Sequence, residues 1–366
     1  MLNKLDKKFL DEAKARGKLI FHSEEIPYAR FREDIRNVVR GTVVLGDGSD
    51  RVIFGFPHIA RVFTLEKGIV RNLKSDSFYA EEKIDGFNLR VAKIGKKTFA
   101  FSRGGFVDPF STEKVRSDSV VPDSFFRDYP DYVLCGEMIG NTPYTPPTKD
   151  FDVRFLVFDI ADDSGNYLAP PEKYAVLKKY HLESVPQLGK FTKNPESIKR
   201  LKDVVLTLNK SHKEGMVLKA DDRKSIIKFV TPNADIDDIA HNAHLLFDMP
   251  TGFFLQRLLR SSIFVSEFGL DQKKYASELG DAFSVRLLSA LKDAEAGSGA
   301  FEEFEVLLSD KKTWDGVMKH MSKEVRIEIL SNREEKSGST RIRFKKIYKK
   351  TSKKLHGALS GKGQED

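Results

Sequence analysis

Six short strand-like runs between residues 66 and 232 most strongly limit what this chain can fold into. Turn-forming Gly, Pro and Asp residues separate the runs, which are FNLRVAKI, TFAFS, YVLCGEMIG, RFLVFDIA, GMVLKA and SIIKFV. Two helix-like segments, 170–182 and 195–211, both fall between the fourth and fifth runs. Because the strands come in clusters and do not alternate regularly with helices, the pattern predicts an α+β domain with antiparallel sheets.

The segment before this domain has a pattern of its own. Residues 1–65 begin with an amphipathic helix and continue with β-rich runs on both sides of a Gly-Asp-Gly turn at 46–48. This order predicts a small N-terminal β module followed by the larger domain at 66–232.

After Pro232 apolar residues recur at helical spacing, which predicts a helical domain over 233–296. Between residues 245 and 265 apolar side chains are so frequent that a two-helix hairpin could scarcely bury them alone. They are expected either to pack against another domain or to form a subunit interface, and the residues alone favour neither reading decisively.

The last unit, 297–366, is expected to be a small α/β domain with helices over 301–310 and 314–332. A basic stretch follows, in which eight of the fourteen residues from 341 to 354 are Lys or Arg. Such a stretch suits a groove that tracks a phosphate backbone, with some stacking on the interleaved Ile342, Phe344, Ile347 and Tyr348. A solvated basic tail is the alternative. The expected nucleic-acid contacts are Arg341, Arg343, Lys345, Lys346, Lys349 and Lys350.

Composition and short motifs argue against several other classes of protein. The single cysteine, Cys135, cannot form an internal disulfide, and no Cys/His cluster has zinc-ligand spacing. His241 and His244 lie three apart on a predicted helix, but we expect ordinary packing or surface positions for them. P-loop and dinucleotide-binding motifs are absent. With neither a secretion signal nor an apolar run of membrane-spanning length, we expect a soluble, cytoplasmic protein with no membrane partner. The formal charge of +8 favours an anionic partner.

The segment EEKIDGFNLR, residues 81–90, is the strongest candidate for chemistry. In a strand, alternate side chains face opposite sides, so Asn88 and Arg90 share a polar face. Gly86 allows the backbone to turn tightly, or to approach a ligand closely, just after Lys83. Taken alone, the segment also fits an exposed lysine beside a turn.

Five further fragments follow in order at predicted strand ends: SRGG at 102–105, GE at 136–137, FD at 158–159, EGMVLK at 214–219 and IIK at 226–228. The set resembles the ordered motifs of the covalent nucleotidyltransferases, which comprise ATP-dependent DNA ligases, RNA ligases and mRNA capping enzymes. EEKIDGFNLRV, FSRGGFVDPFS, LCGEMIGNTPY and PNADIDDIAHNAHLLFDMPTGFFLQRLL look like the archaeal-type homodimeric ATP-dependent RNA ligases. That resemblance spans nearly the whole chain.

The resemblance implies a fold, cofactors and substrates. Residues 66–232 would be an adenylyltransferase domain with ATP-grasp-like antiparallel sheets, and 233–296 would be the homodimerisation domain. ATP and a divalent cation, Mg²⁺ or Mn²⁺, would be the cofactors. The substrate would be RNA with 5′-phosphate and 3′-hydroxyl ends, joined between strands or within one strand, and single-stranded DNA is a further candidate.

The resemblance also implies roles for individual residues. Lys83 would carry AMP covalently, Phe158 would stack on adenine, and Arg103 would position ribose or phosphate. Glu137 would bind the ribose and, together with Glu214, the metal. The backbone around Glu81 and Ile84 would read the adenine edge, and Asn88, Lys219 and Lys228 would contact the phosphates.

Two positions depart from the wider superfamily. Asn88 stands where many DNA ligases and capping enzymes have arginine, which fits an RNA ligase better. The last motif usually has two lysines spaced by one residue, but Lys228 is flanked at that spacing by Ile226 and Val230. We expect Lys219 to supply the missing phosphate contact.

The chemistry explains why these residue types are needed. Lys83 must attack the α-phosphate of ATP as a neutral amine, which burial and nearby positive charge favour. Lys219, Lys228 and a divalent cation would stabilise the charge that develops on the phosphates. AMP would then pass to a 5′-phosphate end, and a 3′-hydroxyl would displace it to seal the strand.

Two alternatives remain at this stage. A DNA ligase or a capping guanylyltransferase would use the same motifs, but those enzymes usually continue into an oligonucleotide-binding barrel, whereas 233–330 here is predicted to be helical. A nucleic-acid-binding protein that holds nucleotide without catalysis would not need Lys83, Glu137, Glu214 and Lys228 together.

Overall fold

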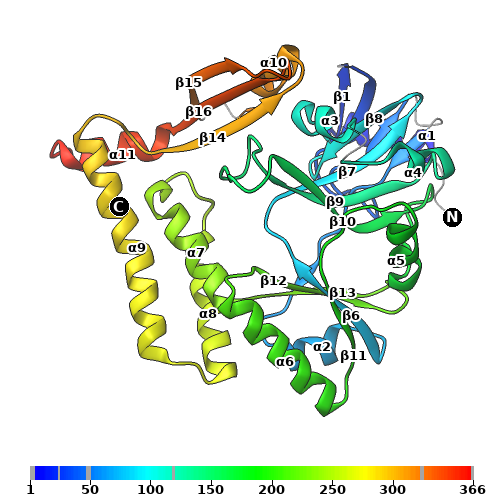
Figure 1. Ribbon diagram of the computed structural model, residues 1–366, viewed down its shortest axis with the longest axis horizontal. Coiled ribbons are helices and arrows are strands. Elements are labelled where there is room, and N and C mark those ends of the chain that lie inside the picture. Colours follow the sequence, from blue (N-terminus) through cyan, green and yellow to red (C-terminus); the bar gives the residue numbers. More distant parts are fainter. Residues whose placement is uncertain (1–4, 24, 47–50, 118–119, 322–324, 364–366) are drawn as a thin grey trace.

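The computed structural model describes residues 5–23, 25–46, 51–117, 120–321 and 325–363. They form four sheets with helices packed around them (Figure 1). Paired strands run antiparallel, apart from β5 (Ala60–Arg61), which runs parallel to β13 (Ile226–Val230). The prediction of an α+β fold with antiparallel sheets is therefore confirmed.

A small sheet near the N-terminus follows the sequence order β1-β2-β3-β4, with strands at Leu19–Ser23, Pro27–Phe31, Val43–Leu45 and Arg51–Ile53. The preceding helix α1 (Lys7–Ala15) starts at Asp6, whose side chain caps the backbone N–H of Lys8. Its apolar side buries Phe9 against Phe31 of the sheet. Residues 47 and 48 of the predicted Gly-Asp-Gly turn lie outside the described part of the chain.

Two larger sheets form the centre of the molecule. The first has the order β10-β9-β7-β8, with strands at Val153–Ala161, Val133–Gly140, Phe87–Ile94 and Lys97–Ser102. The second has the order β11-β6-β12-β13-β5, with β11 at Gln187–Thr192, β6 at Ser77–Lys83 and β12 at Gly215–Ala220. All six predicted strand runs are strands, but β6, which ends at Lys83, was not among them. Its charged residues Glu81 and Glu82 are buried, so its sequence looks more polar than its surroundings are.

Helices cover the outer faces of these sheets. Helices α2 (Leu65–Asn72) and α6 (Pro195–Lys210) pack on the five-stranded sheet. The central four-stranded sheet, β10-β9-β7-β8, is covered by α3 (Pro109–Val115), α4 (Asp123–Asp128) and α5 (Pro170–Lys179). The faces that remain uncovered by helices are those that carry the polar residues of the site.

A helical region begins at Pro232, as predicted. It consists of α7 (Pro232–Asn242), a short 3-10 helix η1 (Ala243–Leu245), α8 (Phe253–Phe268) and α9 (Gln272–Glu295). One side of α8 packs on the five-stranded sheet, where the Phe264 and Phe229 ring centroids are 5.5 Å apart. The other side leaves Leu255 and Leu259 71% and 53% exposed. Part of the apolar surplus is thus buried within the chain and part is not. No helix among the described residues is long and apolar enough to cross a membrane.

The C-terminal unit corrects one prediction. Residues 301–310, predicted as a helix, contain strand β14 (Phe301–Leu308), and the second predicted helix is split into α10 (Lys311–His320) and β15 (Val325–Glu334). The buried Phe304, Val306 and Leu308 alternate with Glu303, Glu305 and the less buried Leu307, which is the two-residue period of a half-buried strand. Strand β14 pairs with β16 (Thr340–Tyr348). The chain ends in α11 (Lys349–Leu359), which packs against α9. Helix α10 contacts α3, so the C-terminal unit packs against a helix that covers one of the central sheets (Figure 1).

Candidate active site

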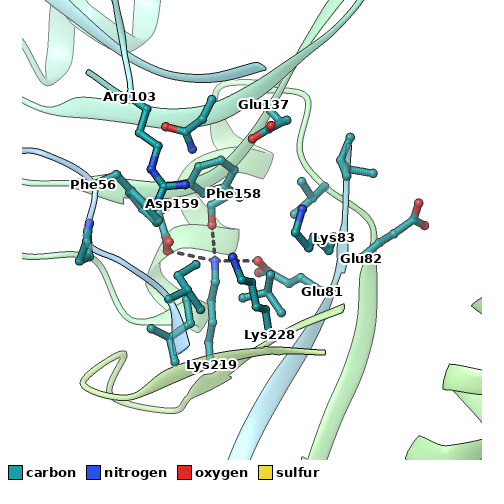
Figure 2. A pocket seen from close by; sticks show the side chains of 17 residues that line it. Phe56, Glu81, Glu82, Lys83, Arg103, Glu137, Phe158, Asp159, Lys219 and Lys228 are labelled. Carbon is teal, nitrogen blue, oxygen red and sulfur yellow. Dashed lines mark hydrogen bonds and ion pairs between the residues drawn. The ribbon is translucent and has the colours of Figure 1, made fainter. Parts of the chain in front are cut away.

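A pocket lies between the two central sheets (Figure 2). Residues from β6, β12 and β13 form one wall, residues of the four-stranded sheet form the other, and the segment between β4 and β5 closes one side. The predicted nucleotide-binding residues that line it are Glu81, Lys83, Ile84, Asn88, Arg103, Glu137, Phe158, Lys219 and Lys228. Glu214, the remaining one, lies against Lys83. Residues far apart in the sequence are thus gathered at one place.

Lys83 stands at the end of β6 with its ammonium donating to the carboxylate of Glu214. The pairing of Lys83 with Gly215 across β6 and β12 brings Glu214 to this position. Burial raises the pKa of Glu214, and the positive charge of Lys83 opposes that rise. In the turn that follows, a Cβ on Gly86 would lie 2.6 Å from the carbonyl oxygen of Met138, so this residue must be glycine for the turn to pack against β9.

A network of buried charges lies beside Lys83 and includes Lys219 (Figure 2). The Lys219 ammonium is 2.7 Å from a carboxylate oxygen of Glu81 and 3.1 Å from one of Asp159, and all three side chains are 1% exposed. Lys173 donates to Glu81, and Arg223 donates to Asp159 over 2.7 Å. Because the Lys219 ammonium is fully buried and already paired with two carboxylates, this arrangement favours a structural role for it over the predicted phosphate contact.

Glu137 projects from β9 into the pocket without a hydrogen-bond donor among the described residues. Burial raises its pKa to about 8, although the charge of Lys83 lowers it, and the carboxylates of Glu214 and Asp85 add to the rise. A buried carboxylate next to another carboxylate is stabilised by a cation. Within the described residues no group of three or more His, Cys, Asp or Glu side chains gathers. The donor set is therefore small, as it is for Mg²⁺ that is bound mainly by phosphates and water.

Phe158 lines the pocket from β10 and packs edge-on against Phe56, with ring centroids 5.0 Å apart. Phe56 comes from the segment between β4 and β5, and Pro57 and Ile59 of the same segment also line the pocket. Sequence reasoning missed these three, because no motif marks them and only the return of the chain to β13 brings them here. This apolar end is suited to a flat heterocycle.

Lys228 and Arg103 supply positive charge at the pocket. Burial, together with the nearby charges of Arg61, Lys83 and Arg103, lowers the pKa of Lys228 to about 8. Arg103 is exposed, and one of its guanidinium nitrogens is 3.3 Å from Nδ1 of His58. Between an apolar end and a carboxylate pair, these cations make the pocket suitable for an aromatic group that carries phosphates.

The basic run at 341–354 belongs to β16 and α11, outside this pocket. Fewer of its side chains are available to contact nucleic acid than predicted. Arg341 pairs with Glu305 and Glu335, Arg343 and Lys345 pair with Glu303, and Lys346 is partly buried and donates to the carbonyl of Pro143. The prediction that interleaved apolar residues stack on bases is wrong for three of them, since Ile342, Phe344 and Ile347 are buried in the unit's own core. Lys349 and Lys350 begin α11, where both are exposed.

The two predicted histidines are occupied in packing. His241 Nε2 is 2.7 Å from Glu302, and His244 Nε2 is 3.2 Å from the carbonyl oxygen of Phe301. These contacts join the helical region to β14, so both histidines stand in the ordinary packing positions that were expected.

Comparison with known proteins matches two family models. Residues 76–230 match the RNA ligase model, and residues 241–362 match the model of the C-terminal region of the ligase Pab1020. Over its length the chain is 30% identical to the uncharacterized protein MJ0414 of Methanocaldococcus jannaschii, an alignment that covers 92% of this chain and 89% of that protein.

Solved structures extend the likeness to the whole fold. A protein of Aquifex aeolicus provisionally described as an ATP-dependent DNA ligase has a TM-score of 0.91 and 30% identity, covering 98% of this chain and 100% of that one. An archaeal ATP-dependent RNA ligase has a TM-score of 0.88 and 28% identity, covering 98% and 97%. The pocket, the helical region and the C-terminal sheet are therefore parts of one shared architecture.

Proposed function

This chain belongs to the archaeal-type family of ATP-dependent RNA ligases, and on that premise we propose that it joins 5′-phosphate and 3′-hydroxyl RNA ends through AMP carried on Lys83. The observation that carries the proposal is the position of Lys83 at the end of β6, in contact with Glu214 and between the phenylalanine-lined and the cationic parts of one pocket. A reaction that consumes ATP and RNA is expected in the cytoplasm.

In the first step, the Lys83 amine attacks the α-phosphate of ATP. An N–P bond forms, the bond between the α-phosphorus and the bridging oxygen breaks, and pyrophosphate leaves. Glu214, already hydrogen-bonded to the attacking nitrogen, directs the amine and is the nearest acceptor for its proton. Phe158 and Phe56 hold the adenine, and Lys228 with Arg103 attracts the phosphates.

Glu137 and Glu214 are the residues that would hold a divalent cation, Mg²⁺ or Mn²⁺. Burial raises the pKa of both, and the Glu214 carboxylate adds to the rise at Glu137, which fits a pair that is stabilised by added positive charge. When bound, the cation supplies charge that stabilises the phosphates during transfer.

In the later steps AMP moves from Lys83 to the 5′-phosphate of RNA, and the 3′-hydroxyl attacks that phosphate and releases AMP. The same steps would seal DNA, and the likeness to the Aquifex aeolicus protein keeps a DNA ligase as the second candidate. Helices α7 to α9, which follow β13 in place of a barrel, argue against a capping guanylyltransferase.

The choice between RNA and DNA is tested with matched ends. Single-stranded RNA and DNA of one sequence, each with a 5′-phosphate and a 3′-hydroxyl, and a nicked DNA duplex are incubated with enzyme, ATP and MgCl₂. We expect RNA to be sealed, or circularised, at least about tenfold faster than either DNA, since contacts to the 2′-hydroxyl distinguish the two. Faster sealing of the nicked duplex would establish the DNA ligase instead.

We also propose that the enzyme is a homodimer held by the helical region. Leu255 and Leu259 lie four residues apart on α8, and Val285 and Leu288 lie three apart on α9, so each pair shares one face of its helix. All four are more than half exposed, at 71%, 53%, 61% and 57%. Exposed leucine and valine in this density are typical of an interface.

A charged residue at position 259 should therefore separate the subunits. Leu259→Glu buries two carboxylates at the interface of each dimer and should weaken dimerisation by about 100-fold or more. Light scattering during size-exclusion chromatography measures the mass at several concentrations. Ile329→Glu, at a half-exposed position on β15, is the matched control. A dimer in which Leu259→Glu has no effect would place the interface elsewhere.

A further inference from the structure

Arg61 lies on the same side of the five-stranded sheet as the pocket. Strand β5 is only two residues long and pairs in parallel with β13, with Ala60 opposite Ile227 and Arg61 opposite Lys228. The backbone N–H of Val62 donates to the carbonyl oxygen of Lys228 at 3.0 Å, which fixes this register. Side chains in register on neighbouring strands project to the same face. Arg61 therefore accompanies Lys228, while Ile227 points into the core.

The register places Arg61 at one end of a row that crosses the sheet. From β6 to β5 this row contains Glu81, Val217, Lys228 and Arg61. Three strand spacings, roughly 14 Å, separate β6 from β5. Lys83, on β6, and Arg61, on β5, therefore stand toward opposite sides of this face of the sheet, and the charge of Arg61 acts on neighbouring Lys228. A triphosphate that extends away from Lys83 would run toward Arg61.

The guanidinium of Arg61 lacks the partners that its neighbours have. Arg257 pairs with Asp238 at 2.6 Å, and Arg260 pairs with Asp235. Arg61 makes no hydrogen bond or ion pair with any described residue, and its Nε is buried without an acceptor. A buried, unpaired guanidinium nitrogen is costly, so such a group normally has an anion as its partner. Burial accordingly lowers the pKa of Arg61, and so does the positive charge of Arg260.

Apart from Lys228 and Arg103, the pocket offers little positive charge to a triphosphate. Ile226 and Val230 flank Lys228 where a second lysine would stand, and the Lys219 ammonium is fully buried in ion pairs with Glu81 and Asp159. Departing pyrophosphate carries several negative charges that must be stabilised as the bond breaks. An arginine next to Lys228 supplies a rigid fork of donors that matches phosphate oxygens.

We propose that Arg61 is a further phosphate-binding cation of this site, beside Lys228 and Arg103, and holds the β- and γ-phosphates of ATP, which leave as pyrophosphate. This proposal rests on the proposed function. It assigns Arg61 to the step that charges Lys83 and to its reversal, in which a pyrophosphate oxygen attacks the phosphorus of lysyl-AMP. In that reversal the N–P bond breaks, ATP forms again and Lys83 regains its proton.

The reverse step gives the sharpest test, with inorganic pyrophosphate as the probe. Enzyme is charged to completion with ³²P-labelled AMP at high ATP concentration, freed of ATP, and mixed with pyrophosphate and MgCl₂; loss of label from the protein and formation of ATP are followed. For Arg61→Ala the pyrophosphate concentration that gives half the maximal rate should rise at least about tenfold, as expected when a charge-assisted phosphate contact is lost. Arg61→Lys should be intermediate. Arg71→Ala, an exposed arginine of α2, is the matched control and should behave like the wild type.

A second measurement separates this role from a structural one. Sealing of RNA that already carries AMP on its 5′-phosphate involves no pyrophosphate, so Arg61→Ala should change its rate by less than about twofold. An unchanged pyrophosphate dependence, or an equal loss in both assays, would overturn the proposal. If Arg61→Ala lowers the melting temperature, Arg61→Gln, which keeps a polar but shorter and uncharged side chain, takes its place. A wild-type enzyme that never acquires label would refute the proposed function itself, which is a different result.

Discussion

Alanine at position 83 should abolish the joining of RNA ends that carry a 5′-phosphate. Without the amine there is no acceptor for AMP, and the loss should be on the order of 10⁴-fold or more, as for removal of other covalent nucleophiles. The rate of sealing is measured with labelled RNA, ATP and MgCl₂. Lys210→Ala, at an exposed lysine that ends α6, is the matched control and should retain full activity.

The same variant also distinguishes the first step from the last. RNA that already carries AMP on its 5′-phosphate bypasses Lys83, so Lys83→Ala should seal it within about tenfold of the wild-type rate. Measurable joining of ordinary 5′-phosphate RNA by Lys83→Ala would mean that another group carries AMP, or that no covalent intermediate exists.

Methionine at position 219 should destabilise the protein strongly. It removes the cation between Glu81 and Asp159 and leaves both carboxylates buried with less compensation, which typically costs about 3–5 kcal/mol. Equilibrium unfolding in urea, followed by circular dichroism, measures the change. Lys224→Met is the control, because its 79% exposed side chain pairs with an exposed carboxylate, and the expected change is within about 0.5 kcal/mol.

This variant also separates two readings of Lys219. If Lys219 served chiefly as a phosphate contact, Lys219→Met would fold with nearly normal stability and bind ATP poorly. The buried network predicts instead that Lys219→Met loses stability, and that any loss of ATP binding is a consequence of that loss.

The strand pattern was the most predictable part of the fold. Runs such as FNLRVAKI and GMVLKA correspond to β7 and β12 residue by residue, because their apolar content and flanking turns are local properties. Strand β6 was missed since Glu81 and Glu82 look like surface residues until Lys173 and Lys213 supply their partners. Such burial depends on residues about ninety or more positions away, which no local pattern contains.

In the C-terminal unit, a strand was predicted as a helix. FEEFEVLL at 301–308 has enough helix-forming residues to suggest a helix, but its alternation buries Phe304, Val306 and Leu308 against β16. Tertiary pairing therefore outweighed local propensity. The basic run at 341–354 was overestimated for a similar reason, because its acidic partners Glu303 and Glu305 lie on β14, about forty positions earlier.

The site residues that belong to sequence motifs were predicted, whereas those that only the chain topology brings to the site were missed. Lys83, Glu137, Phe158 and Lys228 stand in ordered fragments and meet in one pocket. Phe56 and Arg61 stand in a segment without a motif, and the parallel pairing of β5 with β13 brings Phe56 to the pocket and Arg61 beside Lys228. A residue whose role depends on a two-residue strand cannot be found from sequence periodicity.

The most direct test of the account is to locate AMP on the protein. Enzyme freed of bound nucleotide is incubated with ATP and MgCl₂, and peptide mass spectrometry under conditions that preserve the N–P bond finds the modified residue. The account predicts AMP on Lys83, its release by pyrophosphate, and its transfer to 5′-phosphorylated RNA. AMP on another residue, or a nucleotide-free enzyme that is never modified, would contradict it.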